Sequence, residues 1–169
     1  MLPVKAVREA VITTLIEWHD KFVSVLYVND ESSVTTFHIT PLYIPNGFSP
    51  VETPDENSGF YYAQFSDSHN NWFDILVIPI ENTQETFLDN EFSTYYSINC
   101  NGIQAIWGIM SDGSNTLLWE RGTLSFQVCG NLDLTELIKI SEKIGLNNFS
   151  CKPFALLYRI HLQEVHVKE

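Results

Sequence analysis

Residues 98–145 decide the fold class, and they read INCNGIQAIWGIMSDGSNTLLWERGTLSFQVCGNLDLTELIKISEKIG. Asn101-Gly102 lies between two strand-like runs, residues 94–100 and 103–110. Asn-Gly is a strong hairpin signal because both residues tolerate the positive φ of a type I′ turn. The first part of the stretch therefore predicts a β-hairpin.

A second hairpin follows the polar loop at residues 111–115. Arg121-Gly122 separates strand-like residues 115–120 from 123–128, and as a two-residue turn it places Trp119 opposite Leu124. Residues two apart in a strand share a face. One face of this hairpin then carries Leu117, Trp119, Leu124, Phe126 and Val128, and the other carries Thr116, Leu118, Glu120, Thr123, Ser125 and Gln127. Such alternation is typical of a sheet that is buried on one side.

A helix is predicted directly after this hairpin. Asp133-Leu134-Thr135-Glu136 has the form of a capping box, and Gly145 supplies a left-handed stop. The apolar stripe of this helix comprises Leu134, Leu137, Ile138, Ser141 and Ile144. We expect the stripe to pack on the sheet face that bears Trp119 and Phe126.

The order of several short motifs resembles that of a known family. The motifs are INCNG (98–102), LLW (117–119), FQVCG (126–130), LTELIKI (134–140) and, earlier, PLYIPNGF (41–48). They resemble an uncharacterised extracytoplasmic domain found at the C-terminal end of membrane-bound, anti-sigma-factor-like proteins of Gram-positive bacteria. The likeness covers roughly residues 4–145, and it carries over no catalytic residue.

The N-terminal part predicts one helix and a strand pair. Val4, Val7, Val11, Leu15, Trp18 and Phe22 recur at helical spacing, which predicts a helix over residues 4–21. Residues 22–28 and 33–40 are predicted to be paired strands joined by a turn at 29–32.

The middle of the chain contains an edge segment and a second strand pair. Residues 41–55 contain four prolines and are expected to wrap one edge of the sheet. Residues 60–65 and 72–78 are predicted strands joined by a polar loop, and residues 80–91 are a connector of uncertain form. Residues 146–169 depart from the family pattern, and their alternation leaves open an added edge strand or a flexible end.

The sequence thus predicts a single α+β domain over residues 1–169. One twisted antiparallel sheet of about six to eight strands carries an N-terminal helix and a second helix near the C-terminus.

Charge excludes two classes of partner. The chain has 9 Lys and Arg against 21 Asp and Glu, a net charge of -12, and residues 22–120 hold 13 acids with no Lys or Arg. Nucleic acids and anionic lipids need cationic contacts, so neither is an expected partner of this region. The acids are interpreted as a solvated surface in preference to a dedicated cation site.

Cys100, Cys129 and Cys151 lack the spacing of metal ligands, and an odd count disfavours a disulfide framework. The hairpin register places Cys100 and Cys129 at opposite ends of the sheet, so we expect no bridge between them. The pairing of Cys151 is left open.

No residue is predicted to be catalytic, metal-binding or cofactor-binding. Asp67-Ser68-His69 contains the residue types of a catalytic triad, but adjacent residues in a loop predict a polar turn. Asp112-Gly113-Ser114-Asn115 lacks the spaced acids of a calcium loop. His19-Asp20, His38, His161 and His166 are isolated from other ligands. No cofactor is expected.

No run is long and apolar enough to cross a bilayer, and no signal peptide precedes the first predicted helix. The resemblance implies that a preceding membrane span lies outside this chain and that the domain faces the outside of the membrane; a soluble cytoplasmic protein is the alternative. The expected function is a non-enzymatic sensory or interaction domain that binds an unknown protein or small molecule. The alternative is a carrier with an apolar groove for a small molecule or lipid.

Overall fold

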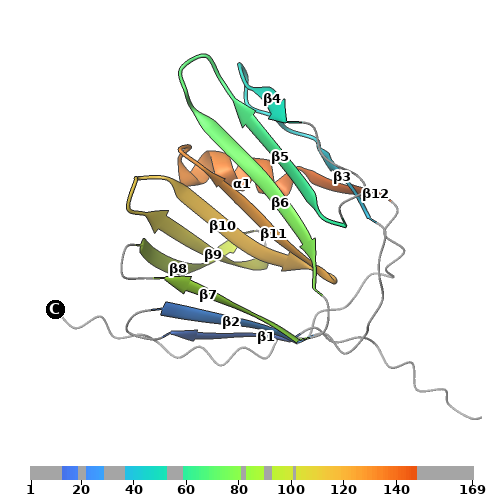
Figure 1. The fold of residues 1–169 in the computed structure, drawn as a ribbon, viewed down its shortest axis with the longest axis vertical. Coiled ribbons are helices and arrows are strands. Elements are labelled where there is room, and N and C mark those ends of the chain that lie inside the picture. Colours follow the sequence, from blue (N-terminus) through green and yellow to red (C-terminus); the bar gives the residue numbers. More distant parts are fainter. Residues whose placement is uncertain are drawn as a thin grey trace, which may run out of the picture.

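A seven-stranded antiparallel sheet runs through the computed structural model, which describes residues 13–18, 22–28, 37–52, 59–80, 83–89, 93–100 and 102–147. Its strand order is β4-β5-β6-β11-β10-β9-β8 (Figure 1). These strands are β4 (Ser49–Glu52), β5 (Tyr61–Ser66), β6 (Trp72–Pro79), β8 (Ser93–Cys100), β9 (Ile103–Met110), β10 (Asn115–Arg121) and β11 (Leu124–Gly130). The α+β class and the large antiparallel sheet are confirmed.

The remaining elements form layers on the two faces of this sheet. Helix α1 (Leu134–Glu142) lies across one face, against β10 and β11 (Figure 1), and we call this the helix face. A two-stranded sheet of β3 (His38–Pro41) and β12 (Ile144–Asn147) adds to the same layer. A three-stranded sheet of β1 (Thr13–Trp18), β2 (Phe22–Val28) and β7 (Thr83–Asp89) packs on the opposite face.

The main core lies between the sheet and the helix layer. Leu137 of α1 is fully buried beside sheet residues that include Phe73, Phe126 and Val128. The rings of Phe65 and Phe73 stack with centroids 4.8 Å apart. Burial of such side chains from water is the dominant favourable term in folding, so the packing of this layer stabilises the fold.

A smaller core lies on the opposite face, which the sequence had assigned to polar residues. Val23 and Val25 of β2 pack with Ile80, Ile106 and Leu118, and all five are buried. The large sheet is therefore covered on both faces at β9 and β10.

Both hairpins of the stretch 98–145 form, but the second turn differs by one residue. Trp119 lies opposite Phe126, and Arg121 lies opposite Leu124, so the two-residue turn is Gly122-Thr123. The register shifts by two residues relative to the prediction. Because strand side chains alternate with period two, an even shift leaves the predicted inward face unchanged.

The start of α1 is as predicted, but its end is not. The Asp133 carboxylate caps the helix by accepting from the Glu136 backbone N–H at 2.8 Å. The helix ends at Glu142 without a left-handed glycine, and Gly145 is instead paired with Thr40 in β12. A Cβ on Gly145 would lie 3.2 Å from the Thr40 oxygen, so the close approach of the two strands explains the glycine.

The predicted N-terminal helix over residues 4–21 is wrong where the structure describes it. Thr13–Trp18 forms β1, in which every residue pairs with β2. Residues 1–12 and 19–21 lie outside the described residues. Strand β2 does not pair with the predicted strand 33–40; it lies between β1 and β7, and β3 pairs with β12. The connector 80–91 contains β7.

The proline-rich segment borders the large sheet, as predicted. Strand β4 is its edge strand, and the register with β5 shifts between Pro50 and Glu52. The predicted pair of strands 60–65 and 72–78 is confirmed by β5 and β6. Of the tail 146–169, only Leu146 and Asn147 are described, as the end of β12.

Candidate functional site

The two polar loops considered as catalytic or calcium-binding motifs are built as side-chain-capped turns. Asp67 accepts hydrogen bonds from the backbone amides of His69 at 2.8 Å and Asn71 at 2.9 Å. These bonds, and first of all one from the Asn71 side chain, hold the pKa of the Asp67 carboxyl below its usual value. Ser68 and His69 are exposed. The prediction of a polar turn at this position is confirmed.

The second polar loop follows the same chemistry. Asp112 accepts from the Ser114 hydroxyl at 2.6 Å and from the Ser114 amide at 2.9 Å, and the pKa of its carboxyl is lowered by these bonds. Just beyond the loop, the Trp107 indole N–H donates to Asn115 Oδ1 at 2.9 Å. The Asn115 amide in turn donates to the Leu132 carbonyl, which ties the sheet to the segment before α1.

Cys100 and Cys129 are free thiols, as the hairpin register predicts. Cys100 belongs to the helix-face core, and burial together with the nearby Glu142 raises the pKa of its thiol. Cys129 pairs in register with Asp74 and Thr116 on the opposite face. Burial, with a smaller effect from Asp74, raises the pKa of Cys129 to about 11. Thiols with raised pKa values are poor nucleophiles because little thiolate is present.

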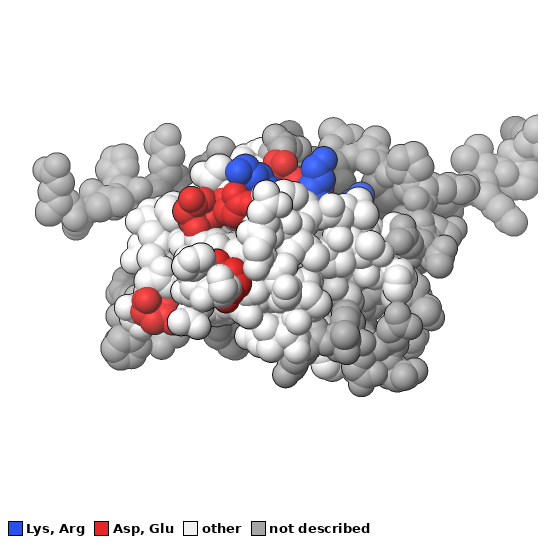
Figure 2. Space-filling view, turned by 90° about the horizontal axis from the view of Figure 1, so that it is seen from above, with Lys and Arg blue, Asp and Glu red and all other residues white. Residues whose placement is uncertain are grey.

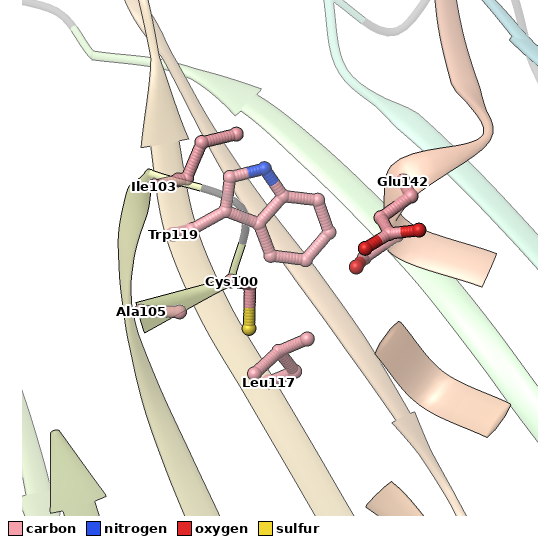
Figure 3. A pocket seen from close by; sticks show the side chains of 7 residues that line it. Cys100, Ile103, Ala105, Leu117, Trp119 and Glu142 are labelled. Atoms are coloured by element: carbon pink, nitrogen blue, oxygen red, sulfur yellow. The ribbon is translucent and has the colours of Figure 1, made fainter. Parts of the chain in front are cut away.

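A small cavity lies between the sheet and the end of α1. Figure 3 shows the Trp119 ring on one side and the Glu142 carboxylate on the other, with the Cys100 sulfur beside Leu117. Its volume is about 30 Å³. That volume accommodates a water molecule or two, and it is far below what a lipid chain requires.

Asp74 is half-buried on the face opposite α1, between Gln64 on β5 and Cys129 on β11. Burial raises the pKa of its carboxyl to about 6, and a hydrogen bond from the Cys129 backbone opposes this rise. Asp74 was not among the predicted site residues. The apolar run around it, Trp72-Phe73 and Ile75-Leu76, was the signal that could have identified a carboxyl within a buried strand.

The segment 41–48 holds apolar side chains at the surface while its alternate residues anchor it. The Tyr43 hydroxyl donates to Glu136 of α1, Pro45 is buried, and the Phe48 ring lies 5.3 Å from that of Phe73. The hydrogen bond raises the pKa of Tyr43 and lowers that of Glu136.

Between these anchors, Leu42 is 68% exposed and Ile44 is 37% exposed. We call these two residues the Leu42–Ile44 surface. The motif and the prolines mark this segment in the sequence, but the exposure of these two side chains was not predicted. Their alternation with Tyr43 and Pro45 was the available signal.

Charged side chains are unevenly distributed over the described surface. The side chains of Lys and Arg that the structure describes are Arg121, Lys139 and Lys143. In Figure 2 the blue atoms lie along one margin, beside red atoms, and most of the remaining described surface is uncharged. Lys139 donates to Glu136 at 2.9 Å, so this described cation is neutralised by an acid of the same helix.

Other sequence candidates are scattered. His38 is in β3, whereas His19-Asp20, Cys151, His161 and His166 lie outside the described residues. Within the described ranges, no three His, Cys, Asp or Glu side chains gather in the way a metal ion needs. None of the described helices has the length and apolar character needed to cross a membrane.

Comparison with known proteins identifies the family but not an activity. A family model described as "Domain of unknown function (DUF4367)" matches residues 38–144, from the start of β3 to the start of β12. Neither the curated proteins nor the solved structures gave a significant match. Since the matched residues make up more than half of the 169-residue chain, it belongs to this family of domains of unknown function.

Proposed function

We propose that this chain is a non-enzymatic sensory or interaction domain on the extracytoplasmic side of a membrane-anchored, anti-sigma-factor-like protein of a Gram-positive bacterium. Membership of an uncharacterised domain family supports the domain-level part of this proposal. The motif order at residues 41–48 and 98–140 supports the parent protein and its location by resemblance. Binding of a partner to such a domain alters the attached protein only through a difference in affinity between two states.

The Leu42–Ile44 surface is the observation that carries the proposal. An exposed Leu beside an exposed Ile, on a segment anchored by Tyr43, Pro45 and Phe48, is preorganised for contact. Little conformational entropy is lost when an already anchored segment binds. Contiguous exposed apolar surface marks interaction sites, and we infer that Leu42 and Ile44 lie at the centre of such a site.

The geometry favours a protein partner over a stored lipid. The cavity beside Trp119 has a volume of only about 30 Å³, so it does not favour the carrier alternative. The described surface carries three cationic side chains, and Lys139 is paired with Glu136, which disfavours a polyanionic partner for the described surface.

Two measurements on the full-length protein test this proposal in cells. Ser68→Cys places a thiol in the exposed β5–β6 turn, and a membrane-impermeant maleimide should label it in intact cells. Labelling only after lysis would refute the extracytoplasmic location.

The second measurement is the output of a promoter that depends on the partner sigma factor. The double substitution Leu42→Ser and Ile44→Ser should change this output while leaving the melting temperature of the domain nearly unchanged. Phe60→Ser is the matched control, because Phe60 is also an apolar side chain with 44% exposure. An unchanged output in the double variant, or an equal change in the control, would refute the role of this surface.

The absence of catalysis is tested on the purified chain. We expect no turnover of generic ester, phosphate or peptide substrates. The Ser68 hydroxyl lies 3.4 Å from His69 Nδ1, but the two are adjacent residues of an exposed turn that is open to water. Turnover that Ser68→Ala or His69→Ala abolishes would overturn the non-enzymatic assignment.

A further inference from the structure

The two edges of the large sheet differ in a way that indicates a docking edge. Strand β4, at one edge, has four residues, contains Pro50 and is irregular between Pro50 and Glu52. Short length, proline and bulges are devices by which proteins prevent edge-to-edge pairing. This edge is therefore protected against a further strand.

Strand β8, at the other edge, has none of these protections. It has eight residues, STYYSINC, with neither proline nor charge, and all eight pair with β9 without interruption. Among the described strands, β9 is its sole partner. Thr94 and Tyr96 are exposed on the helix face, and Ser97 and Asn99 are exposed on the other. Between these positions, Tyr95 packs against the smaller core and Ile98 against the main core, so β8 is exposed in part on each face.

Apolar side chains continue from this edge across the helix face. Tyr96 is 44% exposed and stacks on Trp107 at 5.0 Å between ring centroids, and Ile103 is 40% exposed. An added strand would thus gain backbone hydrogen bonds and cover aromatic surface at the same time.

Charge permits a second copy of the chain to approach this edge. Two copies of a chain with a net charge of -12 repel each other unless they meet where neither carries acids. Neither β8 nor β9 contains a charged residue, although acids occur on both sides of them in the sequence. Two copies can therefore meet at this edge without bringing acidic side chains of β8 or β9 together.

We propose that β8 pairs with β8 of a second copy of this chain, forming a two-fold symmetric dimer with one continuous antiparallel sheet. Residues opposite each other in an antiparallel pair point to the same face. A two-fold axis perpendicular to the sheet keeps each side chain on the same face of the sheet in both copies. Residues that pair across the axis must therefore both have even numbers or both have odd numbers. One residue therefore lies on the axis opposite its own copy. Tyr96, Ser97 and Ile98 are the candidates near the middle of the strand.

Sedimentation velocity of the purified chain over a hundredfold range of concentration tests the dimer. We expect a concentration-dependent dimer, and Tyr96→Lys should raise its dissociation constant at least tenfold by placing two like charges across the axis. Val51→Lys adds the same charge on the protected edge at a side chain that is 55% exposed, and it should leave the constant unchanged. A wild-type monomer at every concentration, or equal effects of the two variants, would overturn the proposal.

Cysteine scanning provides an independent readout that does not depend on the tolerance of position 96. Directly opposed strand residues have Cα atoms about 4.5–5.5 Å apart, within the range of a disulfide. Among Tyr96→Cys, Ser97→Cys and Ile98→Cys, one variant should form a self-linked dimer far faster than the other two under mild oxidation. Peptide mapping identifies the link and excludes Cys100. Equal or absent linkage in all three variants would contradict strand pairing at β8, whereas the function proposed for the Leu42–Ile44 surface is tested separately.

Discussion

Asp74 contributes to stability with a pH dependence opposite to that of most carboxylates in folded proteins. Its pKa is raised to about 6 by burial, whereas the unfolded chain has the ordinary value of 3.8. Between these values the folded state holds the proton more tightly, so the contribution of Asp74 to stability is highest below pH 4 and is lost as pH rises through 6. We expect Asp74→Asn to be more stable than wild type at pH 7.5 by about 1–2 kcal/mol, after allowance for partial exposure. At pH 4 the difference should vanish.

Urea unfolding at both pH values measures this difference. Asp67→Asn is the control, because this substitution should change stability at neutral pH in the opposite direction. Hydrogen bonds lower the pKa of Asp67, so its stabilisation is present at neutral pH and is lost on acidification. Asp67→Asn should therefore weaken the fold at pH 7.5. A destabilised Asp74→Asn protein at pH 7.5 would show that the Asp74 carboxylate has a favourable partner when charged.

The Tyr43 hydroxyl connects the segment 41–48 to α1 through one hydrogen bond. In Tyr43→Phe the Glu136 carboxylate loses the strongest of the interactions that lower its pKa. We expect the pKa of Glu136 to rise towards its ordinary value in an NMR titration and the melting temperature at pH 7 to fall. Because the lowered pKa stabilises the fold above the unfolded value, the loss should shrink as the pH approaches 4. An unchanged Glu136 titration would exclude the hydrogen bond in solution.

At the level of elements, local signals predicted local structure. Asn101-Gly102 marked the first hairpin, and Asp133 marked the start of α1. Both depend on a few neighbouring residues whose backbone or side-chain chemistry is decisive. The second turn was predicted one residue too early, but the inward-facing residues were predicted correctly. Burial of Leu117 and Phe126 determines which side chains face the core, whereas the turn sequence leaves the exact strand pairing less well determined.

Non-local pairing was beyond the same reasoning. Leu15, Trp18 and Phe22 have helical spacing, although Thr13, Thr14 and Ile16 are β-branched. Strand β1 pairs with β2, and β2 pairs on its other side with β7, which lies far away in the sequence. Likewise, nothing near β3 indicates that it pairs with β12, about a hundred residues later. The exposure of the Leu42–Ile44 surface was not predicted for a related reason. The contacts that fix this segment, and so direct Leu42 and Ile44 to the surface, are made with the distant elements α1 and β6.

Gly130 at the end of β11 tests how closely two elements are packed. A Cβ there would lie 2.4 Å from the Trp72 carbonyl oxygen and 2.9 Å from the Phe73 Cα, and these backbone atoms cannot move without disturbing β6. We expect Gly130→Ala to lower the free energy of unfolding by about 3 kcal/mol. Gly113→Ala is the comparison: its Cβ meets nothing within 4 Å, and only its φ of +83° is unfavourable, at about 1 kcal/mol. Equal losses in urea unfolding would mean that β11 and β6 separate easily.

At the scale of the whole molecule, the packing of the layers and the net charge have opposite effects on the stability of the compact state. Cores on both faces of the large sheet favour the compact state, whereas a net charge of -12 favours expansion. Lys139 and Glu136 neutralise each other locally, and the long acidic span from 22 to 120 has no Lys or Arg to do the same. Screening of this repulsion should therefore stabilise the chain as a whole.

Salt and calcium separate general screening from specific cation binding. Raising sodium chloride shortens the Debye length to about 10 Å at 0.1 M, which weakens repulsion between exposed carboxylates and should raise the melting temperature by a few degrees. Calcium chloride at the same ionic strength should give the same curve if the acids form only a solvated surface. A specific site would instead stabilise the fold by mass action at a far lower calcium concentration. A large shift in calcium alone would therefore locate a real cation site among the acids, and Asp112→Asn would show whether the loop before β10 forms part of it.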